Sequence, residues 1–371
     1  MLASEFPPAP HPHLREKNFE VSASACHTRN FPYEMEDLKR IVFFGSDAIA
    51  IPILETIESE PLSKIAKLEA IFSQPDRPQG RGQKIHPNAV AKWAREHGVK
   101  LFQPEKLGEE SVQILKNLKC DIGLVMAYGH ILRPALIAAP TIGIYNYHAS
   151  LLPRYRGPAP VEAAIANNDG GAGVTLQKIA PALDEGDVVG SAVIPLDCHA
   201  TRASLRDKIS EACIFITQDT LPRIINGTAE EIPQSEKRVS YTRKISRADA
   251  GIDFSFPAKK IAARIRALCG WPGCTISFDN LELKIGDAIA LANDAFPRDG
   301  IAPGTVVASG KSELVIATGD GFLQVCALQR PGGKMLATKD FLAGMKIPAG
   351  TFFESREMRP LFRSTPWLRK K

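Results

Sequence analysis

Several features that would point to common functional classes are missing from this chain. No apolar run in its 371 residues approaches the roughly 20 residues that a transmembrane helix needs. The seven cysteines are scattered without a CxxC pair or zinc-finger spacing, and no HExxH motif occurs. The glycine after the first apolar run lies in GSDAIA, which lacks the GxGxxG spacing of a dinucleotide site. The sequence therefore predicts no membrane span, metal centre or nicotinamide site, and it indicates reduced cysteines in a cytoplasmic protein.

The net charge of +5 is distributed unevenly along the chain. From Glu236 to the end there are 22 Lys and Arg residues against 13 Asp and Glu, which gives +9. The part before it has 24 against 28, which gives −4. A basic C-terminal part is typical of a protein that binds a polyanion there, and it is equally typical of a solvated surface with no partner.

Residues 1–38 differ in composition from the rest of the chain. They are rich in Pro and His, show no apolar period and lack the continuous apolar stretch of a secretory signal. The acidic residues Glu5, Glu16 and Glu20 argue against a transit peptide. Met35 stands just before the first strand-like run. We therefore expect a disordered leader or a misassigned translation start.

From residue 39 to residue 228 the pattern alternates between strands and helices. Short runs that are apolar throughout, such as RIVFFG and DIGLVMAYG, alternate with segments of helical spacing, such as NAVAKWAREHG. Such a pattern predicts an α/β domain whose mostly parallel sheet is covered on both faces. Ligands bind these sheets beyond the carboxyl ends of the strands, so we expect the chemistry in the loops after Ser73, Ala127 and Tyr147.

The pattern changes near residue 228. Residues 229–246 are polar and have no clear period, so we interpret them as a linker. In residues 247–371 one amphipathic helix, PAKKIAARIRALCG, is followed by short strand-like pieces punctuated by Gly and Asp. Several short strands at regular spacing predict a small β-barrel. The chain is therefore expected to contain two domains.

Three polar residues near strand ends form the candidate catalytic group. Asn146 and His148 are one residue apart in an apolar run, so their side chains share one face of a strand. Asp184 follows another strand-like stretch, VTLQKI. An amide, an imidazole and a carboxylate can hold a carbonyl, move a proton and orient the proton carrier, which indicates acyl transfer to an amine. Taken singly, each residue also fits a structural role as a cap, a hydrogen-bonded histidine or a turn residue.

Three segments, in this order, carry a resemblance to a known family. QPDRP at 74–78 is followed by GRG at 80–82, NYHASLLPRYRG at 146–157 fits NxHxSLLPxxRG, and LDEGD at 183–187 fits LDxGD. With these segments the chain resembles the methionyl-tRNA formyltransferases of the folate-dependent formyltransferase family, from about Arg40 to about Phe353. The resemblance implies a Rossmann-like formyltransferase domain followed by a small OB-like β-barrel domain that binds tRNA.

The resemblance also implies a reaction. The α-amino group of methionyl-initiator tRNA would attack the formyl carbon of 10-formyltetrahydrofolate, a co-substrate that needs no metal, and a tetrahedral oxyanion would form. Asn146 would hold the formyl oxygen and stabilise the oxyanion. His148 would donate a hydrogen bond to the same oxygen or move a proton between the amine and the leaving group, and Asp184 would fix its tautomer.

A tetrahydrofolate pocket is implied at the ends of two neighbouring strands. The loop that leaves the catalytic strand and the end of the preceding strand would form its walls, because backbone groups and apolar side chains suit a flat pterin ring. For the residues of the preceding strand, a place in the buried core fits equally well. The residues assigned to the pocket are Ser150, Leu151, Leu152, Pro153, Val125, Met126, Ala127, Tyr128 and Gly129.

Basic residues of two segments are candidates for contacting tRNA. The loop at 74–84 would reach phosphates and the acceptor end, with Arg81 entering the acceptor stem, and the basic helix near residue 260 would add phosphate contacts. A solvated arginine in a flexible turn is the alternative interpretation of Arg81. The residues assigned to tRNA are Arg77, Arg81, Lys84, Lys259, Lys260, Arg264 and Arg266.

Two other kinds of function stay open. A different folate-dependent enzyme, which formylates an amino sugar nucleotide or glycinamide ribotide or hydrolyses the formyl folate, could use the same three catalytic residues. A non-catalytic RNA-binding protein on a degenerate scaffold belongs to another class. The basic loop at 74–84 and the basic C-terminal part favour tRNA as the partner, and the sequence does not reveal how initiator tRNA is distinguished from elongator tRNA. The resemblance suggests a monomer, and nothing in the sequence indicates a membrane.

Overall fold

The computed structural model describes residues 38–79 and 82–367, so residues 1–37 of the expected leader lie outside the described residues. The chain divides into two compact units. The first contains the described residues up to Arg156 together with Ala172–Ile194 and Arg206–Val239. The second contains Gly157–Gly171, Pro195–Leu205 and the described residues from Ser240 onward. The chain therefore passes between the two units more than once before residue 240.

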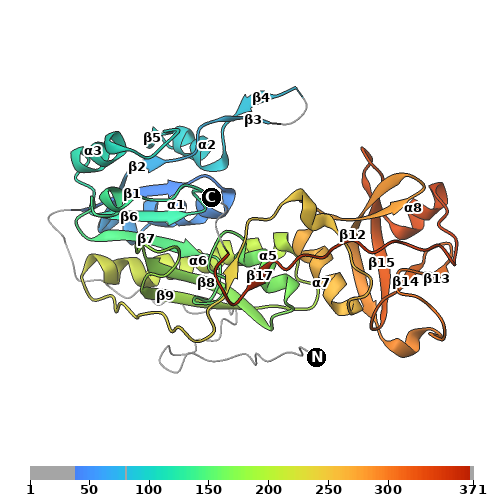
Figure 1. Ribbon diagram of the computed structural model, residues 1–371. Coiled ribbons are helices and arrows are strands. Elements are labelled where there is room, and N and C mark those ends of the chain that lie inside the picture. Colours follow the sequence, from blue (N-terminus) through green and yellow to red (C-terminus); the bar gives the residue numbers. More distant parts are fainter. Residues whose placement is uncertain (1–37, 80–81, 368–371) are drawn as a thin grey trace. The chain divides into compact units, whose positions relative to one another are not determined.

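A seven-stranded sheet forms the centre of the first unit, in the order β5-β2-β1-β6-β7-β8-β9 (Figure 1). Neighbouring strands from β5 to β7 are parallel, and β8 runs antiparallel to β7. This confirms the expected mostly parallel sheet. Its strands are β1 (Lys39–Gly45), β2 (Ala66–Phe72), β5 (Lys100–Phe102), β6 (Ile122–Met126), β7 (Gly143–His148), β8 (Gly171–Lys178) and β9 (Val188–Pro195).

Helices cover both faces of this sheet, as expected for strands that are apolar throughout. On one face Phe44 of β1 belongs to a buried cluster with Leu115 and Leu136 from two helices. On the other face the hydroxyl groups of Tyr147 and Thr217 lie 2.7 Å apart, which joins β7 to the longest helix. The helices are α1 (Ile51–Glu58), α2 (Ala89–Glu96), α3 (Glu109–Asn117), α4 (Pro134–Ile137) and α6 (Arg202–Ile225), with the short 3₁₀ helices η1 (Ala48–Ala50) and η2 (Leu62–Lys64).

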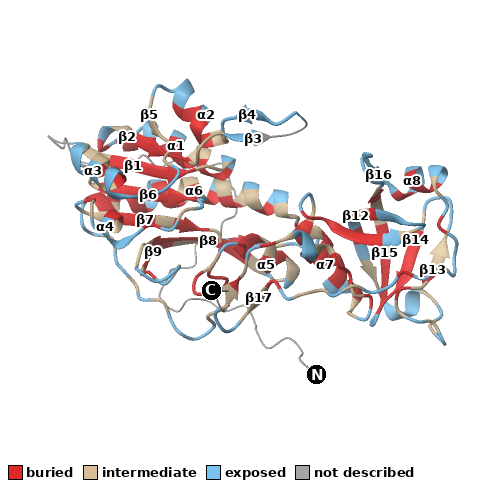
Figure 2. Ribbon diagram, turned by 45° about the horizontal axis from the view of Figure 1, so that its top comes forward, coloured by how far each residue is buried: buried red, intermediate tan, exposed pale blue. Residues whose placement is uncertain are grey.

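The basic segment at 74–84 overlaps a two-stranded hairpin that projects from the sheet (Figure 1). Strand β3 (Arg77–Gln79) pairs antiparallel with β4 (Lys84–His86), and Arg77 lies opposite His86. Figure 2 shows that the described residues of β4 are exposed. Backbone pairing therefore orders both arms of a segment that the sequence predicts to be a loop.

The second unit is built around a six-stranded antiparallel sheet in the order β11-β12-β15-β14-β13, with β16 pairing with β15. Helix α7 packs Ile261, Ile265 and Leu268 into its buried core, as the helical spacing predicts. This unit confirms the small OB-like β domain. Its strands are β10 (Tyr241–Thr242), β11 (Cys274–Phe278), β12 (Leu281–Leu291), β13 (Val306–Ser309), β14 (Leu314–Ala317), β15 (Phe322–Gln329), β16 (Met335–Ala337) and β17 (Phe362–Arg363). Its helices are α5 (Pro160–Ala166), η3 (Arg247–Ala250), α7 (Ala258–Leu268), η4 (Asn293–Ala295) and α8 (Thr338–Gly344).

An ionic cluster lies buried inside the second unit. Asp249 has an exposed fraction of 0% and pairs with Arg243 through both carboxylate oxygens. Ser246 donates to the same carboxylate from its backbone N (2.7 Å) and from its hydroxyl (3.0 Å). Burial raises the pKa of this carboxyl, but the hydrogen bonds from Arg243 and Ser246 and the charge of Arg243 outweigh it and lower the pKa to about 2. Asp249 is therefore held as a carboxylate.

In the described part of the chain no helix is both long and apolar enough to cross a membrane.

Candidate active site

The face of β7 changes from apolar to polar toward its carboxyl end. Ile144 belongs to the buried cluster beneath α3 and α4, and Asn146 and His148 follow it at intervals of two residues. Side chains at such intervals lie on one face of a strand. The structure therefore places the two predicted catalytic residues together at the carboxyl end of a central strand, where ligands bind sheets of this class.

Two polar residues of β8 lie beside them, and sequence reasoning missed both. The register pairs Gln177 with Asn146 and Thr175 with His148. Directly opposite residues of antiparallel strands share a face of the sheet. Thr175 and Gln177 are almost completely buried, at 1% and 2% exposed. The sequence shows two polar residues, two positions apart, within an apolar strand. Buried polar groups need hydrogen-bond partners, so this pattern could have indicated that both residues belong to the site.

The ring of His148 lies between two hydrogen-bond acceptors. Its Nδ1 is 3.6 Å from Oδ2 of Asp184, and its Nε2 is 2.9 Å from the backbone oxygen of Tyr155. Both ring nitrogens donate only when each carries a proton; a neutral ring donates to one neighbour and not the other. The structure thus brings His148 and Asp184 close together, although the two residues are 36 positions apart, at a separation somewhat longer than a hydrogen bond.

The loop that carries Asp184 is held against β8. Asp184 has a φ of 56°, in the left-handed region that few residues other than glycine occupy. Gln177 donates from Nε2 to Oδ1 of Asp184 at 3.1 Å. Gly186 lies so close to the strand that a Cβ there would be 1.6 Å from the backbone oxygen of Lys178. The glycine of the LDxGD motif therefore allows the close approach that positions the carboxylate.

Asn146 has a side chain that is partly exposed and makes no hydrogen bond to another described residue. Its amide therefore keeps two donor hydrogens for a ligand at the strand end. This is the arrangement that an oxyanion-stabilising group needs, since a donor already used by the protein would have to exchange partners during the reaction.

Thr175 anchors the loop that leaves β7. Its Oγ1 donates to the backbone oxygen of Ser150 at 2.7 Å and accepts from the backbone N of Leu152 at 3.1 Å. Ser150 Oγ donates to the backbone oxygen of Arg154 at 2.6 Å. Ser150, Leu152 and Pro153 are buried, whereas Leu151 is half-buried. Of the four loop residues assigned to the folate pocket, Leu151 is thus the most accessible.

The segment from Val125 to Gly129 divides into core and surface. Val125, Met126 and Tyr128 are buried, and burial raises the pKa of Tyr128 to about 12. Ala127 and Gly129 are exposed and have positive φ values of 48° and 84°. The side chains of the first three therefore belong to the core, and the turn at Ala127–Gly129 presents backbone at the carboxyl end of β6.

Comparison with known proteins identifies the family. The family model "Formyl transferase" matches residues 39–217, and "Formyl transferase, C-terminal domain" matches residues 244–346. Methionyl-tRNA formyltransferase from Halorhodospira halophila is 34% identical over 311 residues, which are 84% of this chain and 98% of that protein. The enzyme of the same name from Chromobacterium violaceum is 35% identical over 84% of this chain and 98% of its own length. This chain belongs to the methionyl-tRNA formyltransferase family.

Solved structures with lower identity share the fold of this methionyl-tRNA formyltransferase family member. The sugar 3N-formyltransferase WlaRD, crystallised in the presence of dTDP and 5-N-formyl-THF, covers 79% of this chain and 97% of its own with a TM-score of 0.59 at 20% identity. HypX from Aquifex aeolicus, in complex with tetrahydrofolic acid, covers 86% of this chain and 51% of its own with a TM-score of 0.54 at 16% identity. At these identities the likeness shows the fold alone.

The residues assigned to tRNA differ in accessibility. Lys84 is exposed, and Arg77 is exposed and forms an ion pair with Glu105 at 2.6 Å that is open to solvent and therefore weak. Lys259 and Lys260 are exposed on α7. Arg81 lies outside the described residues. Four of the assigned residues thus present charge that a polyanion can reach.

The assignment of Arg264 to tRNA phosphates is contradicted by the structure, and Arg266 is less accessible than the two lysines. Arg264 is 5% exposed, and its Nη1 and Nη2 donate to the backbone oxygens of Arg359 and Asp249, both at 2.9 Å. Arg266 is half-buried and donates to Oδ1 of Asn168 at 3.1 Å. Arg264 therefore links helix α7 to two other segments of the second unit, and its side chain is not available to phosphates.

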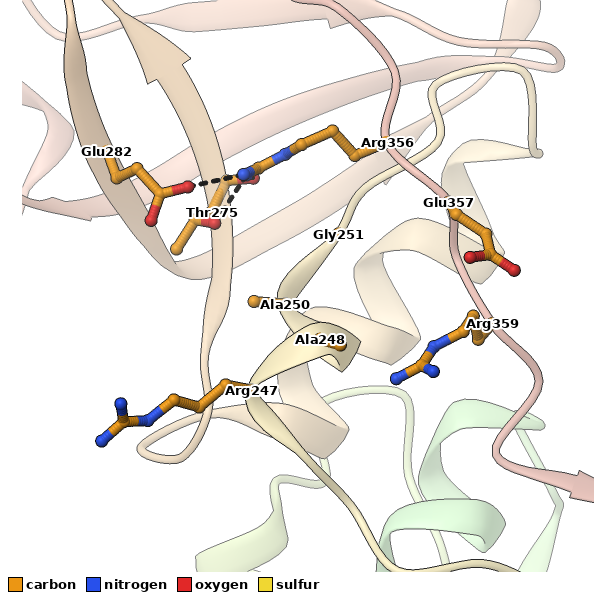
Figure 3. Close-up of a pocket in the computed structure, with 9 residues that line it drawn as sticks. All are labelled: Arg247, Ala248, Ala250, Gly251, Thr275, Glu282, Arg356, Glu357 and Arg359. Atoms are coloured by element: carbon orange, nitrogen blue, oxygen red, sulfur yellow. Dashed lines mark hydrogen bonds and ion pairs between the residues drawn. The ribbon is translucent and has the colours of Figure 1, made fainter. Parts of the chain in front are cut away.

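A cavity of about 290 Å³ in the second unit contains none of the residues assigned from the sequence (Figure 3). Figure 3 shows the guanidinium of Arg356 held between Glu282 and Thr275. Two carboxylates offset much of the charge of three arginines, so the cavity is not strongly basic. Its lining residues are Arg247, Ala248, Ala250, Gly251, Thr275, Glu282, Arg356, Glu357 and Arg359.

Among residues 38–79 and 82–367, no group of three or more His, Cys, Asp or Glu side chains is arranged to hold a metal ion.

Proposed function

We propose that this chain transfers the formyl group of 10-formyltetrahydrofolate to the α-amino group of methionyl-initiator tRNA, giving N-formylmethionyl-tRNA for translation initiation. One observation carries the proposal. Asn146, His148 and Asp184 converge at the carboxyl end of β7, beside the SLLP loop, in a chain that spans 98% of a methionyl-tRNA formyltransferase. In this proposal residues 39–228 form the catalytic domain, and residues 247–371 bind tRNA after the linker 229–246.

The proposed reaction needs no covalent enzyme intermediate. The lone pair of the α-amine forms a bond with the formyl carbon, and the carbonyl electrons move to its oxygen. The Asn146 amide donates a hydrogen bond to this oxyanion. Removing one such donor typically lowers the rate by a factor of about 10²–10³. When the oxyanion collapses, the bond to folate N10 breaks, and the proton lost by the amine is delivered to that nitrogen. His148, beside Asp184, carries this proton or donates to the oxyanion through Nε2, which for this step exchanges the backbone oxygen of Tyr155 for the substrate.

Formyl transfer to tRNA can be tested against the alternatives in one assay. The purified chain is incubated with 10-formyltetrahydrofolate and, in separate reactions, with charged initiator tRNA, with an amino sugar nucleotide, with glycinamide ribotide, or with no acceptor. We expect formylation of the Met-tRNA alone, measured as acid-stable formyl-methionine and as equimolar tetrahydrofolate. Formylation of a small acceptor or folate release without an acceptor would instead assign one of the other folate-dependent reactions, and no turnover with any of the four would leave the RNA-binding alternative.

The exposed lysines of α7 are proposed to contact tRNA phosphates together with Arg77 and Lys84. Reversing the charge of Lys259 and Lys260 (K259E/K260E) should weaken tRNA binding, because two attractive interactions with phosphates are replaced by repulsion. It should also reduce the slope of log affinity against log salt by about 0.7–0.9 for each phosphate that is no longer neutralised. Binding titrations at several salt concentrations measure both effects, and folate affinity should not change.

The matched control for this charge reversal is K116E/K119E, which reverses two exposed lysines at the end of α3 and its following turn. The same loss of affinity in both variants would mean that net charge alone is responsible. An unchanged salt slope in K259E/K260E would contradict the proposed role of these lysines.

The proposal includes a cytoplasmic location, as for the translation machinery that supplies charged tRNA. It also includes a monomeric enzyme, which sedimentation of the purified chain would test.

A further inference from the structure

The polar segment 229–246, interpreted from the sequence as a linker, sends one side chain into the catalytic loop. The Nε2 of Gln234 donates to the backbone oxygen of Asp184 at 2.9 Å and to that of Gly186 at 2.8 Å. The two carbonyls belong to the turn that holds the catalytic carboxylate. A single amide group, with its two donor hydrogens, therefore fixes both ends of the Asp184–Gly186 turn.

The oxygen of the Gln234 side-chain amide is also hydrogen-bonded within the protein. This oxygen, Oε1, accepts from Nε of Arg156 at 3.1 Å and from Nη2 at 2.9 Å. Arg156 is buried and also pairs through Nη1 with Glu185 at 2.9 Å. Because Arg156 fixes the orientation of the amide, the Nε2 group must point at the turn. Gln234 thus joins the last arginine of the NxHxSLLPxxRG segment to the LDxGD segment.

The backbone near Gln234 is anchored too. Ile232 exchanges two hydrogen bonds with Val188 at the start of β9, at 2.8 and 2.9 Å. This pairing lies two residues before Gln234. The side chain therefore reaches the catalytic turn from a fixed point, and its interactions are not those of a freely moving connection.

Asp184 needs such support for two reasons. Its left-handed backbone conformation is uncommon for residues other than glycine, although aspartate adopts it more readily than most, and surrounding contacts help to maintain it. Its carboxylate must also stay within reach of His148, from which it is already 3.6 Å away. Gln177 orients Oδ1 of this carboxylate, and Gln234 holds the backbone on which the carboxylate is carried. The Nε2 of Gln234 also lies 3.3 Å from Oε1 of Gln177, a longer contact than those with the two backbone oxygens.

We propose that Gln234 is a positioning residue for formyl transfer, which holds Asp184 where it can orient His148. The inference rests on the proposed function, since it concerns the same site. Gln234 touches neither substrate in this proposal; it acts through Asp184. Removal of its hydrogen bonds should therefore slow the chemical step and leave substrate binding intact.

The first test is Gln234→Leu, which keeps most of the side-chain volume and removes both hydrogen-bonding groups. We expect kcat to fall about 10- to 100-fold, the size of effect that a small misplacement of a catalytic group produces. The KM values for folate and for Met-tRNA should stay within about threefold of the wild type, as for a group that acts on the chemical step. The matched control is Gln113→Leu, which removes an exposed glutamine that bonds only to Asn117 among the described residues.

The second test separates positioning from general support of the fold. When Asp184→Asn is combined with Gln234→Leu, the second substitution should lower kcat by less than about threefold, because residues that act as one unit are not additive. A purely structural role would instead reduce kcat by the same factor in both backgrounds. Equal factors would therefore overturn the inference.

Gln234→Glu tests the donor role of the side chain separately from its acceptor role. A glutamate keeps an acceptor for Arg156 but has no hydrogen to donate to the two carbonyls, so we expect a loss of kcat at least as large as in Gln234→Leu. Full activity in either variant, beside an active wild type, would overturn the inference alone. A wild type that does not formylate Met-tRNA would instead overturn the proposed function.

Discussion

Replacing Asn146 by alanine is expected to lower kcat for formyl transfer by about 10²–10³, the usual effect of removing one oxyanion donor. The structure leaves the amide of Asn146 without a hydrogen bond to another described residue, so its donors are available to the substrate. The oxyanion exists in the transition state and not in the bound substrate, and the KM values should therefore change little. Steady-state kinetics with both substrates varied measure the two effects.

Asn146→Asp is a more specific test, because it replaces only the side-chain NH₂ group by an oxygen and hardly alters the side-chain volume. It removes the donor and places a negative charge beside the developing oxyanion, so its kcat should be at or below that of Asn146→Ala. Asn117→Ala, at the end of α3, is the control and should retain wild-type kinetics. If Asn146→Asp were as active as the wild type, Asn146 would not be the oxyanion donor.

The sequence predicts the polar end of β7 because the relevant information is local. Side-chain alternation places Ile144, Asn146 and His148 on one face, whatever the rest of the chain does. Because the strands are apolar throughout, the sequence predicts that they are buried in a mostly parallel sheet, and the observed strand order confirms this prediction. The carboxyl end of such a strand is then the expected site, and Asn146 and His148 lie there.

The contribution of β8 could not be predicted in the same way. Gln177 meets Asn146 only because β8 turns back and pairs antiparallel with β7 in one particular register. Shifting that register by one residue would move Gln177 to the other face of the sheet. Nothing in the local pattern of VTLQKI specifies the partner strand or its direction. Gln234 is a stronger case, since it reaches Asp184 across 50 positions from a segment with no period.

Arg264 shows a different kind of error. Residues 261, 264, 265 and 268 follow the spacing i, i+3, i+4 and i+7, so helical geometry places Arg264 on the apolar face. Its assignment to tRNA phosphates followed its positive charge and its place on a basic helix. Burial is possible because Asp249, which precedes the helix, and backbone carbonyls receive the guanidinium. The helical spacing therefore indicated that Arg264 is buried. The groups that bind its buried charge, however, could be identified only from the structure.

The same cluster leads to the largest expected effect on stability. Asp249→Ala should lower the free energy of unfolding of the second unit by about 3–5 kcal/mol, the range for removing one partner of a buried ion pair. Arg243 and Arg264 would remain largely buried without the carboxylate that they face, and Arg359, 3.5 Å from it, would no longer have this anionic neighbour. Hydrogen exchange of the β11 and β12 amides measures this unit by itself, and the β1 and β6 amides of the first unit serve as an internal control.

The pH dependence identifies the charge of Asp249 as the cause. Its pKa is lowered in the folded state from 3.8 to about 2, so the stabilisation is fully present above about pH 4 and is lost as the pH falls toward 2. Asp249→Asn keeps the shape and an acceptor oxygen but cannot ionise. The stability difference between wild type and Asp249→Asn should therefore be constant from about pH 7 to about pH 4 and shrink below it. A difference that stayed constant to about pH 2.5 would show that packing around residue 249, and not its charge, holds the cluster together.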